Sequence, residues 1–323
     1  LDARREALRR QLARLHLEPA ATPGAQRAEV GRGRVLVGAI EPALQAAGVN
    51  RESLVDHPGA LFLRRSWKDG YMYFLANHGD RPLNGWVSLA VPAASVALLD
   101  PMTGRAGVAR SRPHGPSGVE VALDIPPGGA LFVRTFTDRK IAGPAWPYPQ
   151  TRGNPVPLAG TWRVTFLAGG PARPRDFETP TLASWTTRDD PELQRFAGTA
   201  RYTLTFDAPP GDSPKGWRLD LGRVCESARV ALNGRDLGTR FARPFTVDIE
   251  PLQPTGNVLN IEVTNLSANR LRDLDRRGVN WKIFKDINIV NINYKPLDAS
   301  DWPLLDSGLL GPVTLTPLGK IAP

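Results

Sequence analysis

The sequence has only one cysteine and four histidines among its 323 residues, and this scarcity removes two kinds of chemistry. Cys225 has no second thiol with which to form an internal disulfide or a cysteine metal site, so we expect it to be a small buried side chain. The histidines, at positions 16, 57, 78 and 114, are far apart and lack the spacing of zinc ligands. Thiol redox and zinc chemistry are therefore not expected.

Three further absences narrow the class of protein. No apolar run reaches the roughly 18 residues that a membrane helix needs, so no membrane partner is expected. No G-x-S-x-G nucleophile elbow and no glycine-rich phosphate loop occurs, which argues against a serine hydrolase or a nucleotide site. The chain starts at Leu1 with neither an initiator methionine nor a signal-peptide pattern, and we expect it to be part of something longer.

Positive charge is in excess but is not concentrated. Lys+Arg number 41 against 32 Asp+Glu, for a net charge of +9. Residues 1–154 carry 20 basic and 13 acidic side chains, and residues 155–323 carry 21 and 19, so most of the excess is N-terminal. Because the arginines are scattered and form no dense basic stripe, we expect a solvated basic surface and no nucleic-acid partner.

Residues 1–56 are predicted to be the end of an upstream α/β domain, in the order helix, strand, helix. Leu8, Leu12 and Leu15 recur at helical spacing before Pro19. A short apolar run at 33–38 follows, and then a helical pattern that stops at Gly48. One strand and one helix cannot bury both faces, so the rest of that layer is expected upstream.

Residues 57–140 are predicted to form a β-sandwich of five or more strands. Val119, Val121, Leu123 and Ile125 alternate with polar or small residues, as in a strand with one wet face. The segment 100–104 (DPMTG) has the residues of a turn. The predicted strands are 70–77, 85–91, 95–99, 119–125 and 130–136.

A proline-rich linker is predicted over 141–157, followed by a second β domain over 158–323. Asn233-Gly234 is the strongest turn signal of the chain, because this dipeptide favours a two-residue hairpin. Glycine, proline and asparagine punctuate the remaining strands as in a jelly roll. These strands are predicted at 158–166, 200–206, 217–221, 228–232, 245–249 and 258–263.

Several stretches resemble known proteins. Residues 219–265, including 228–234 (ARVALNG) and 256–265 (GNVLNIEVTN), are similar to the galactose-binding-like jelly roll of β-mannosidase-type glycoside hydrolases. Residues 269–281 (NRLRDLDRRGVNW), 294–302 (YKPLDASDW) and 306–313 (DSGLLGPV) resemble the C-terminal end of glycoside hydrolase family 106, the α-L-rhamnosidases. The stretch 64–77 supports the same resemblance, which extends from about residue 33 to 318.

The resemblance implies that the chain is the C-terminal region of a larger enzyme. Separately, the excess of arginine over lysine indicates a GC-rich bacterial source. In that family the catalytic carboxylates belong to an (α/β)8 barrel, which would lie upstream of Leu1. The implied partners are that barrel and a rhamnose-containing glycan, and the implied location is periplasmic or secreted. No catalytic residue carries over, and the chain alone is expected to be inactive.

The carboxylates within the chain give no independent sign of a hydrolytic pair. Asp189, Asp190 and Glu192 occupy a polar loop without the burial that raises the pKa of a general acid. Asp273 and Asp275 are flanked by arginines, and ion pairing on a tight loop is the preferred interpretation. Arg277 stands where a calcium loop needs a third ligand. A calcium site from residues distant in sequence stays open without a supporting motif; no other cofactor or metal is expected.

One C-terminal stretch carries the chemistry that holds sugars, namely aromatic faces with amide, carboxylate and guanidinium groups. The alternative is that the same side chains form the interface with the barrel, and both uses can coexist at a cleft rim. The candidate residues are Asn265, Asn269, Arg270, Asp273, Asn280, Trp281, Asp301 and Trp302.

Three hypotheses therefore remain. The chain is an accessory portion of an α-L-rhamnosidase-like enzyme that braces the barrel, a stand-alone carbohydrate-binding module, or a purely structural module. The expected fold is the same for all three: mainly all-β, with a β-sandwich followed by a galactose-binding-like jelly roll and a short α/β remnant at the N-terminus.

Overall fold

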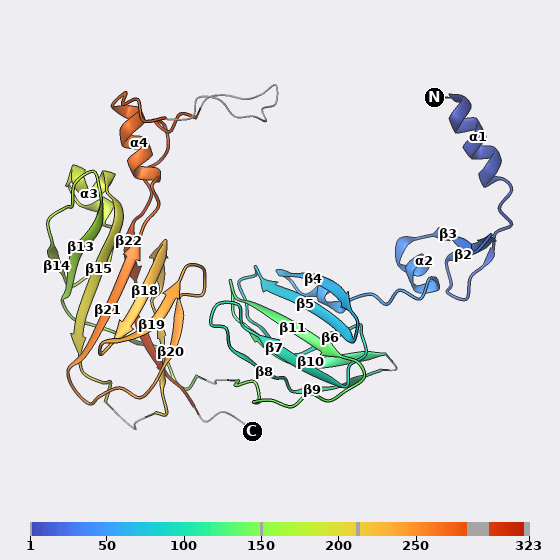
Figure 1. Ribbon diagram of the computed structural model, residues 1–323, viewed down its shortest axis with the longest axis horizontal. Helices are drawn as coiled ribbons and strands as arrows, with labels where there is room; N and C mark the ends of the chain where they lie inside the picture. The colour runs from blue at the N-terminus through green and yellow to red at the C-terminus, as the bar shows by residue number, and fades with distance from the viewer. Residues whose placement is uncertain (1, 116, 149–150, 211–213, 283–296, 320–323) are drawn as a thin grey trace. The chain divides into compact units, whose positions relative to one another are not determined.

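The computed structural model describes residues 2–115, 117–148, 151–210, 214–282 and 297–319. The fold is mainly antiparallel β-sheet, which confirms the predicted class, and the chain divides into two compact units, Leu1–Trp146 and Pro147–Pro323 (Figure 1). None of the described helices is long and apolar enough to cross a membrane.

The N-terminal part of the first unit differs from the expected α/β remnant. Helix α1 (Asp2–Leu12) precedes a three-stranded sheet of β1 (Glu18–Pro19), β2 (Ala25–Val30) and β3 (Gly33–Gly38), and α2 (Ile40–Ala46) follows. Because β2 and β3 form an antiparallel hairpin, β3 is not a lone strand awaiting parallel neighbours. Prediction missed β2 because its sequence, AQRAEV, buries only two alanines and shows little alternation.

The sandwich consists of a five-stranded sheet and a three-stranded sheet, and every strand pair in it is antiparallel. Inward residues such as Tyr73, Val133 and Val121 are fully buried. The predicted strands are present with small shifts, and the structure adds β4, β8 and β9. The larger sheet contains β4 (Ala60–Trp67), β5 (Gly70–Asn77), β11 (Ala130–Phe136), β7 (Ser95–Leu99) and β8 (Ala106–Val108); the smaller contains β6 (Leu83–Leu89), β10 (Gly118–Ile125) and β9 (Ser111–His114).

Each end of the predicted linker is hydrogen-bonded to the compact unit nearest to it. The Val108 amide donates to the Pro144 carbonyl at 2.8 Å, and the Trp146 amide donates to the Val108 carbonyl at 2.8 Å. Further on, β12 (Val156–Pro157) pairs with β23 (Thr314–Pro317). The division between the units therefore falls inside the predicted linker, after Trp146.

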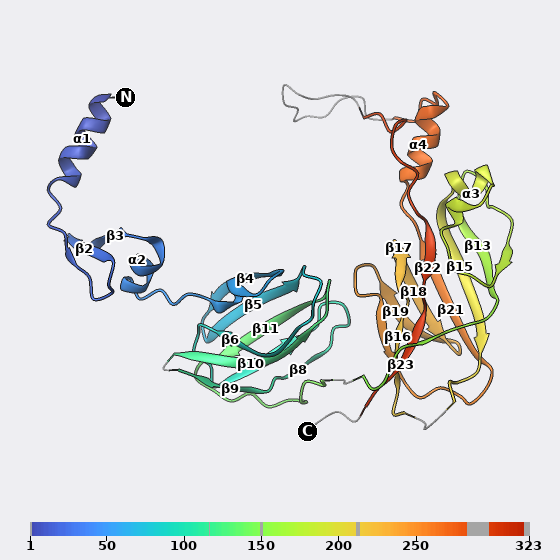
Figure 2. The ribbon, with the colours of Figure 1, turned by 180° about the vertical axis from the view of Figure 1, so that it is seen from behind.

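The second unit is a jelly roll whose two larger sheets share one core. Trp162, Tyr202 and Ile261 from one sheet pack in the same buried cluster as Leu219, Val247 and Leu315 from the other. Figure 2 shows β16 beside β23, at the centre of the second sheet. The six-stranded sheet is β14 (Phe177–Thr179), β13 (Trp162–Gly170), β15 (Ala197–Phe206), β21 (Asn257–Thr264), β18 (Ser227–Leu232) and β19 (Arg235–Arg240); the four-stranded sheet is β12, β23, β16 (Trp217–Asp220) and β20 (Thr246–Ile249).

Local signals in this unit act as predicted. Asn233 and Gly234 join β18 to β19 with φ of 51° and 80°, the positive values that the hairpin turn requires. Cys225 is free and buried at the end of β17 (Arg223–Cys225), which pairs with β22 (Gly308–Gly311), and burial raises the pKa of its thiol. The elements that carry the candidate site are the 3-10 turn η2 (Trp185–Thr187), α3 (Pro191–Arg195) and α4 (Ala268–Arg276).

Candidate functional site

The C-terminal candidate residues gather around α4, a helix where the sequence had indicated a loop. The helix follows β21 and contacts α3, and Figure 1 draws both helices at the same end of the jelly roll. Residues 294–296 of the motif 294–302 lie outside the described part of the chain. The name α4 lobe is used below for residues 265–282 together with 297–307.

Asn265 and Asn269 are buried and engaged within the fold. The Asn265 amide donates to the Phe196 carbonyl at 2.9 Å and to Ser307 Oγ at 3.0 Å, and its oxygen accepts from the Gly198 amide at 2.9 Å. The side chain of Asn269 forms a two-way pair with the Leu305 backbone, 2.8 Å in each direction. Both side chains are buried and bonded to these groups, so in this structure they hold the lobe in place.

The same polar network reaches back into the jelly roll. Ser184 Oγ accepts from the Ser307 amide at 2.9 Å, and Tyr202 Oη accepts from the Leu309 amide at 3.1 Å. Desolvation raises the pKa of Tyr202 to about 12, so its hydroxyl stays neutral. The segment 307–309, which returns from the α4 lobe, thus donates hydrogen bonds to residues more than a hundred positions earlier in the chain.

Arg270 and Asp273 form the ion pair that the sequence indicated, but on a helix. Asp273 Oδ2 lies 2.8 Å from Arg270 Nη1 and 3.4 Å from Arg277 Nη1. Arg195 of α3 lies 3.9 Å from Asp273 Oδ1. Asp273 therefore links α4 to α3 and is surrounded by three arginines. This arrangement indicates a structural role for the carboxylate.

Asp275 connects two segments that are far apart in sequence. Its Oδ1 accepts from Trp281 Nε1 at 2.7 Å and lies 3.2 Å from Lys282 Nζ, while its Oδ2 accepts from the Ala299 amide at 2.8 Å. These contacts lower the pKa of the Asp275 carboxyl. The Ala299 amide has the largest effect, followed by the Trp281 indole and then by Lys282. Flanking charge alone could not reveal this role, because Ala299 lies 24 residues away.

The remaining candidates divide by exposure. Trp281 is partly buried and tied to Asp275, with Lys282 Nζ 5.5 Å from its ring centre. Asn280, Asp301 and Trp302 are exposed, and the Trp302 carbonyl accepts from Arg272 Nε at 2.7 Å. The structure thus leaves three of the eight predicted side chains open to solvent for contact with another molecule.

No arrangement of carboxylates for glycoside hydrolysis appears in the described part of the chain. Asp190 caps α3 by accepting from the Glu192 amide at 2.8 Å, and Glu192 pairs with Arg195. Glu52 is the buried carboxylate of the described residues; it accepts from Tyr73 Oη at 2.5 Å and Arg64 Nη1 at 2.6 Å, with no carboxyl partner. Each carboxyl with a displaced pKa has it lowered, opposite to a general acid.

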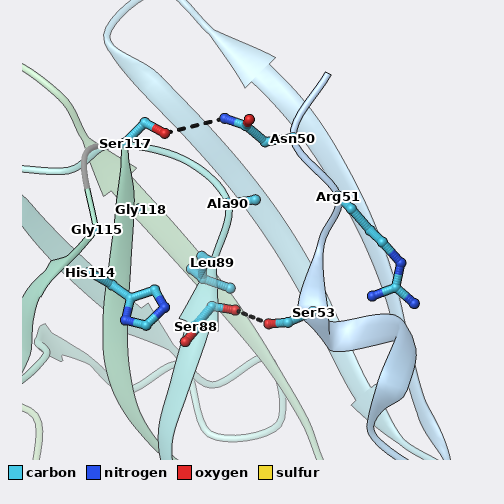
Figure 3. A pocket seen from close by; sticks show the side chains of 10 residues that line it. All are labelled: Asn50, Arg51, Ser53, Ser88, Leu89, Ala90, His114, Gly115, Ser117 and Gly118. Carbon is cyan, nitrogen blue, oxygen red and sulfur yellow. Dashed lines mark hydrogen bonds between the residues drawn. The ribbon is translucent and has the colours of Figure 1, made fainter. Parts of the chain in front are cut away.

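A shallow hollow in the first unit is lined by residues that do not form a catalytic arrangement. It encloses about 280 Å³ between the start of η1 (Ser53–Asp56) and the strands β6 and β9. Figure 3 shows hydrogen bonds from Asn50 to Ser117 and from Ser53 to the Ser88 carbonyl. Arg51 is held by Asp56 and Glu41 instead of facing His114. Among the described residues, no group of three or more His, Cys, Asp or Glu could hold a metal.

Comparisons with known proteins relate the chain to glycoside hydrolases. No protein-family model matches it. The solved rhamnosidase from Novosphingobium sp. PP1Y is 29% identical with a TM-score of 0.65, over 91% of this chain and 27% of that one. A putative β-glucuronidase from Formosa agariphila is 33% identical over 216 residues, 59% of this chain and 18% of that protein. The chain is therefore a glycosidase-related β region that spans roughly a fifth to a quarter of these relatives' lengths.

The depressed pKa of Asp275 gives a direct test of the α4 lobe. An unfolded aspartate titrates near pH ~3.9, so a lower native value means that this carboxylate contributes stability above about pH 4, lost as pH falls through the native pKa. We expect the Trp281 indole proton resonance, assigned with Trp281→Phe, to titrate with a midpoint below that value. Asp275→Asn should abolish the titration. A midpoint at or above pH ~4, or an unchanged titration in Asp275→Asn, would contradict the geometry.

Proposed function

We propose that the chain is the C-terminal accessory region of a glycoside hydrolase that releases terminal rhamnose. The observation that carries this proposal is the match to the Novosphingobium rhamnosidase, because it extends over nine-tenths of the chain and includes both units. A shared jelly roll alone would support only a general carbohydrate-related fold. In this proposal the longer polypeptide contains the catalytic barrel and is periplasmic or secreted.

The acids of the chain support an accessory role. Hydrolysis of a glycosidic bond needs two carboxyl groups across one site, and one of them needs a raised pKa if it is to act as an acid. Asp273 is instead paired with Arg270, and Asp190 and Asp275 accept hydrogen bonds from backbone amides. The bond-breaking pair is therefore assigned to the part of the polypeptide outside these residues.

The surface of the α4 lobe supports a brace against another domain. Leu266, Leu297, Trp302 and Leu305 are all more than one-third exposed, although the segment beneath them is fixed by buried amides. Exposed apolar side chains on a rigid frame are typical of a docking surface. Arg276 and Arg277 are exposed nearby and would favour acidic groups on the partner.

The activity itself gives the first test. The isolated 323-residue chain should show no turnover of p-nitrophenyl α-L-rhamnopyranoside, whereas the longer polypeptide should release nitrophenol. Turnover by the isolated chain that disappears in Asp301→Asn or Asp190→Asn would contradict the assignment of catalysis to another domain. If the longer polypeptide hydrolysed another glycoside but no rhamnoside, the accessory role would stand and the proposed release of rhamnose would be contradicted.

The second candidate function is carbohydrate binding by the α4 lobe, and the observation that favours it is Trp302. Trp302 is 36% exposed and follows the exposed Asp301 in sequence, and the two supply one aromatic face and one hydroxyl-binding group. Calorimetric titration of the isolated chain with L-rhamnose separates the roles. The docking role predicts no binding heat, and the binding role predicts heat that is lost in Trp302→Ala and retained in Trp86→Ala, an exposed tryptophan of the other unit.

A further inference from the structure

The outward face of the β4–β5–β11 sheet is apolar. Opposed residues in a sheet point to the same side, and Leu63 pairs with Phe74, which in turn pairs with Phe132. Leu63 is 59% exposed and Phe74 is 37% exposed, and the rings of Phe74 and Phe132 are 5.0 Å apart. Leu61 and Trp67, on the same side of β4, are 56% and 60% exposed. These residues define the sandwich face: Leu61, Leu63, Trp67, Phe74 and Phe132.

The outward side of the six-stranded jelly-roll sheet differs in composition from the sandwich face. On the outward side of the jelly roll, Arg201 pairs with Glu262 at 2.6 Å and Arg229 pairs with Asp236 at 2.8 Å. Thr203 donates to Asn260 at 2.7 Å in the adjacent row. A solvated sheet face in this protein is thus built from cross-strand polar pairs. Because the sandwich face lacks them, it has the composition of a surface that is covered.

The charge around the sandwich face is predominantly positive. The strands β4, β5, β11, β7 and β8 contain no aspartate or glutamate. Arg65 lies between Leu63 and Trp67 on the outward side of β4, exposed and without an ion-pair partner among the described residues. Near Trp67, Asp69 is shared by Arg134 and Arg139, which leaves that corner net positive.

These features identify the chemistry of the occupant. A second copy of the chain would bring Arg65 and the positive corner against their own counterparts, which is repulsive. A sugar is poorly matched because the five residues of the sandwich face, although three are aromatic, supply no amide or carboxylate to bind its hydroxyls. An apolar protein surface bordered by carboxylates satisfies both the hydrophobic area and the unpaired arginine.

We propose that the sandwich face docks against an apolar, acid-rimmed surface of another domain of the same longer polypeptide. This inference rests on the proposed accessory role but adds a second contact, separate from the α4 lobe and built by the first unit. The outward side of the jelly roll, which carries the Arg201–Glu262 and Arg229–Asp236 pairs, would remain in solvent.

Side-chain footprinting with hydroxyl radicals tests the docking. Leu63, Trp67 and Phe74 should be labelled strongly in the isolated chain and several-fold less in the longer polypeptide. Phe241, which is 68% exposed in the jelly roll, serves as the unprotected control. Equal labelling of the sandwich face in both proteins would overturn the inference. Concentration-dependent protection in the isolated chain, with a dimer by light scattering, would also overturn it in favour of a second copy.

A substitution pair gives an independent readout. Leu63→Arg should leave the melting temperature of the isolated chain unchanged, because Leu63 is already exposed there, and should lower that of the longer polypeptide. The matched control Thr205→Arg, an exposed residue on the outward side of β15, should change neither melting temperature. Equal effects of Leu63→Arg in both proteins would overturn the docking. The rhamnoside assay reports separately on the proposed function, so an active enzyme with an unprotected sandwich face would reject only this inference.

Discussion

Two buried asparagines, Asn265 and Asn269, hold the returning C-terminal segment against the jelly roll, and the arrangement of the α4 lobe depends on them. Their side chains bond to backbone groups of Phe196, Gly198 and Leu305, and the bond to the Phe196 carbonyl is buried. An unmade hydrogen bond of this kind costs about 1–3 kcal/mol, so the network favours one position of the segment over others. The exposed residues of the lobe, Trp302 among them, are displayed from that fixed base.

Charge is used within the chain mainly for positioning. Asp273 joins two helices through three arginines, and Asp275 joins Trp281 to Ala299. The partners of Asp275 stabilise its ionised form and lower its pKa, which is the wrong direction for donating a proton to a leaving sugar. The same interactions that order the lobe thus make Asp275 a poor candidate for a general acid, in keeping with the accessory role proposed for the chain.

Sequence patterns predicted the elements whose burial follows a simple period. Strands such as β5, β7 and β11 were identified with their observed bounds, and Asn233-Gly234 located a hairpin. The patterns missed β4, because its run of apolar residues faces both sides of the sheet, and α4, because its arginines and aspartates resembled a charged loop. Strong periodicity therefore sufficed for the main architecture, whereas it did not reveal β4 or α4.

Chemical type selected the candidate residues but could not distinguish their roles. An asparagine near an aromatic residue can bind a sugar hydroxyl or a backbone amide, and only the fold shows that Asn265 and Asn269 do the second while Asn280 remains exposed. The most direct test of this account is amide hydrogen exchange at Leu305 in Asn269→Ala. The account predicts exchange faster by about 10- to 100-fold, corresponding to one lost hydrogen bond, with no change in Asn280→Ala. Exchange at Leu305 as slow in Asn269→Ala as in the unaltered chain would contradict it.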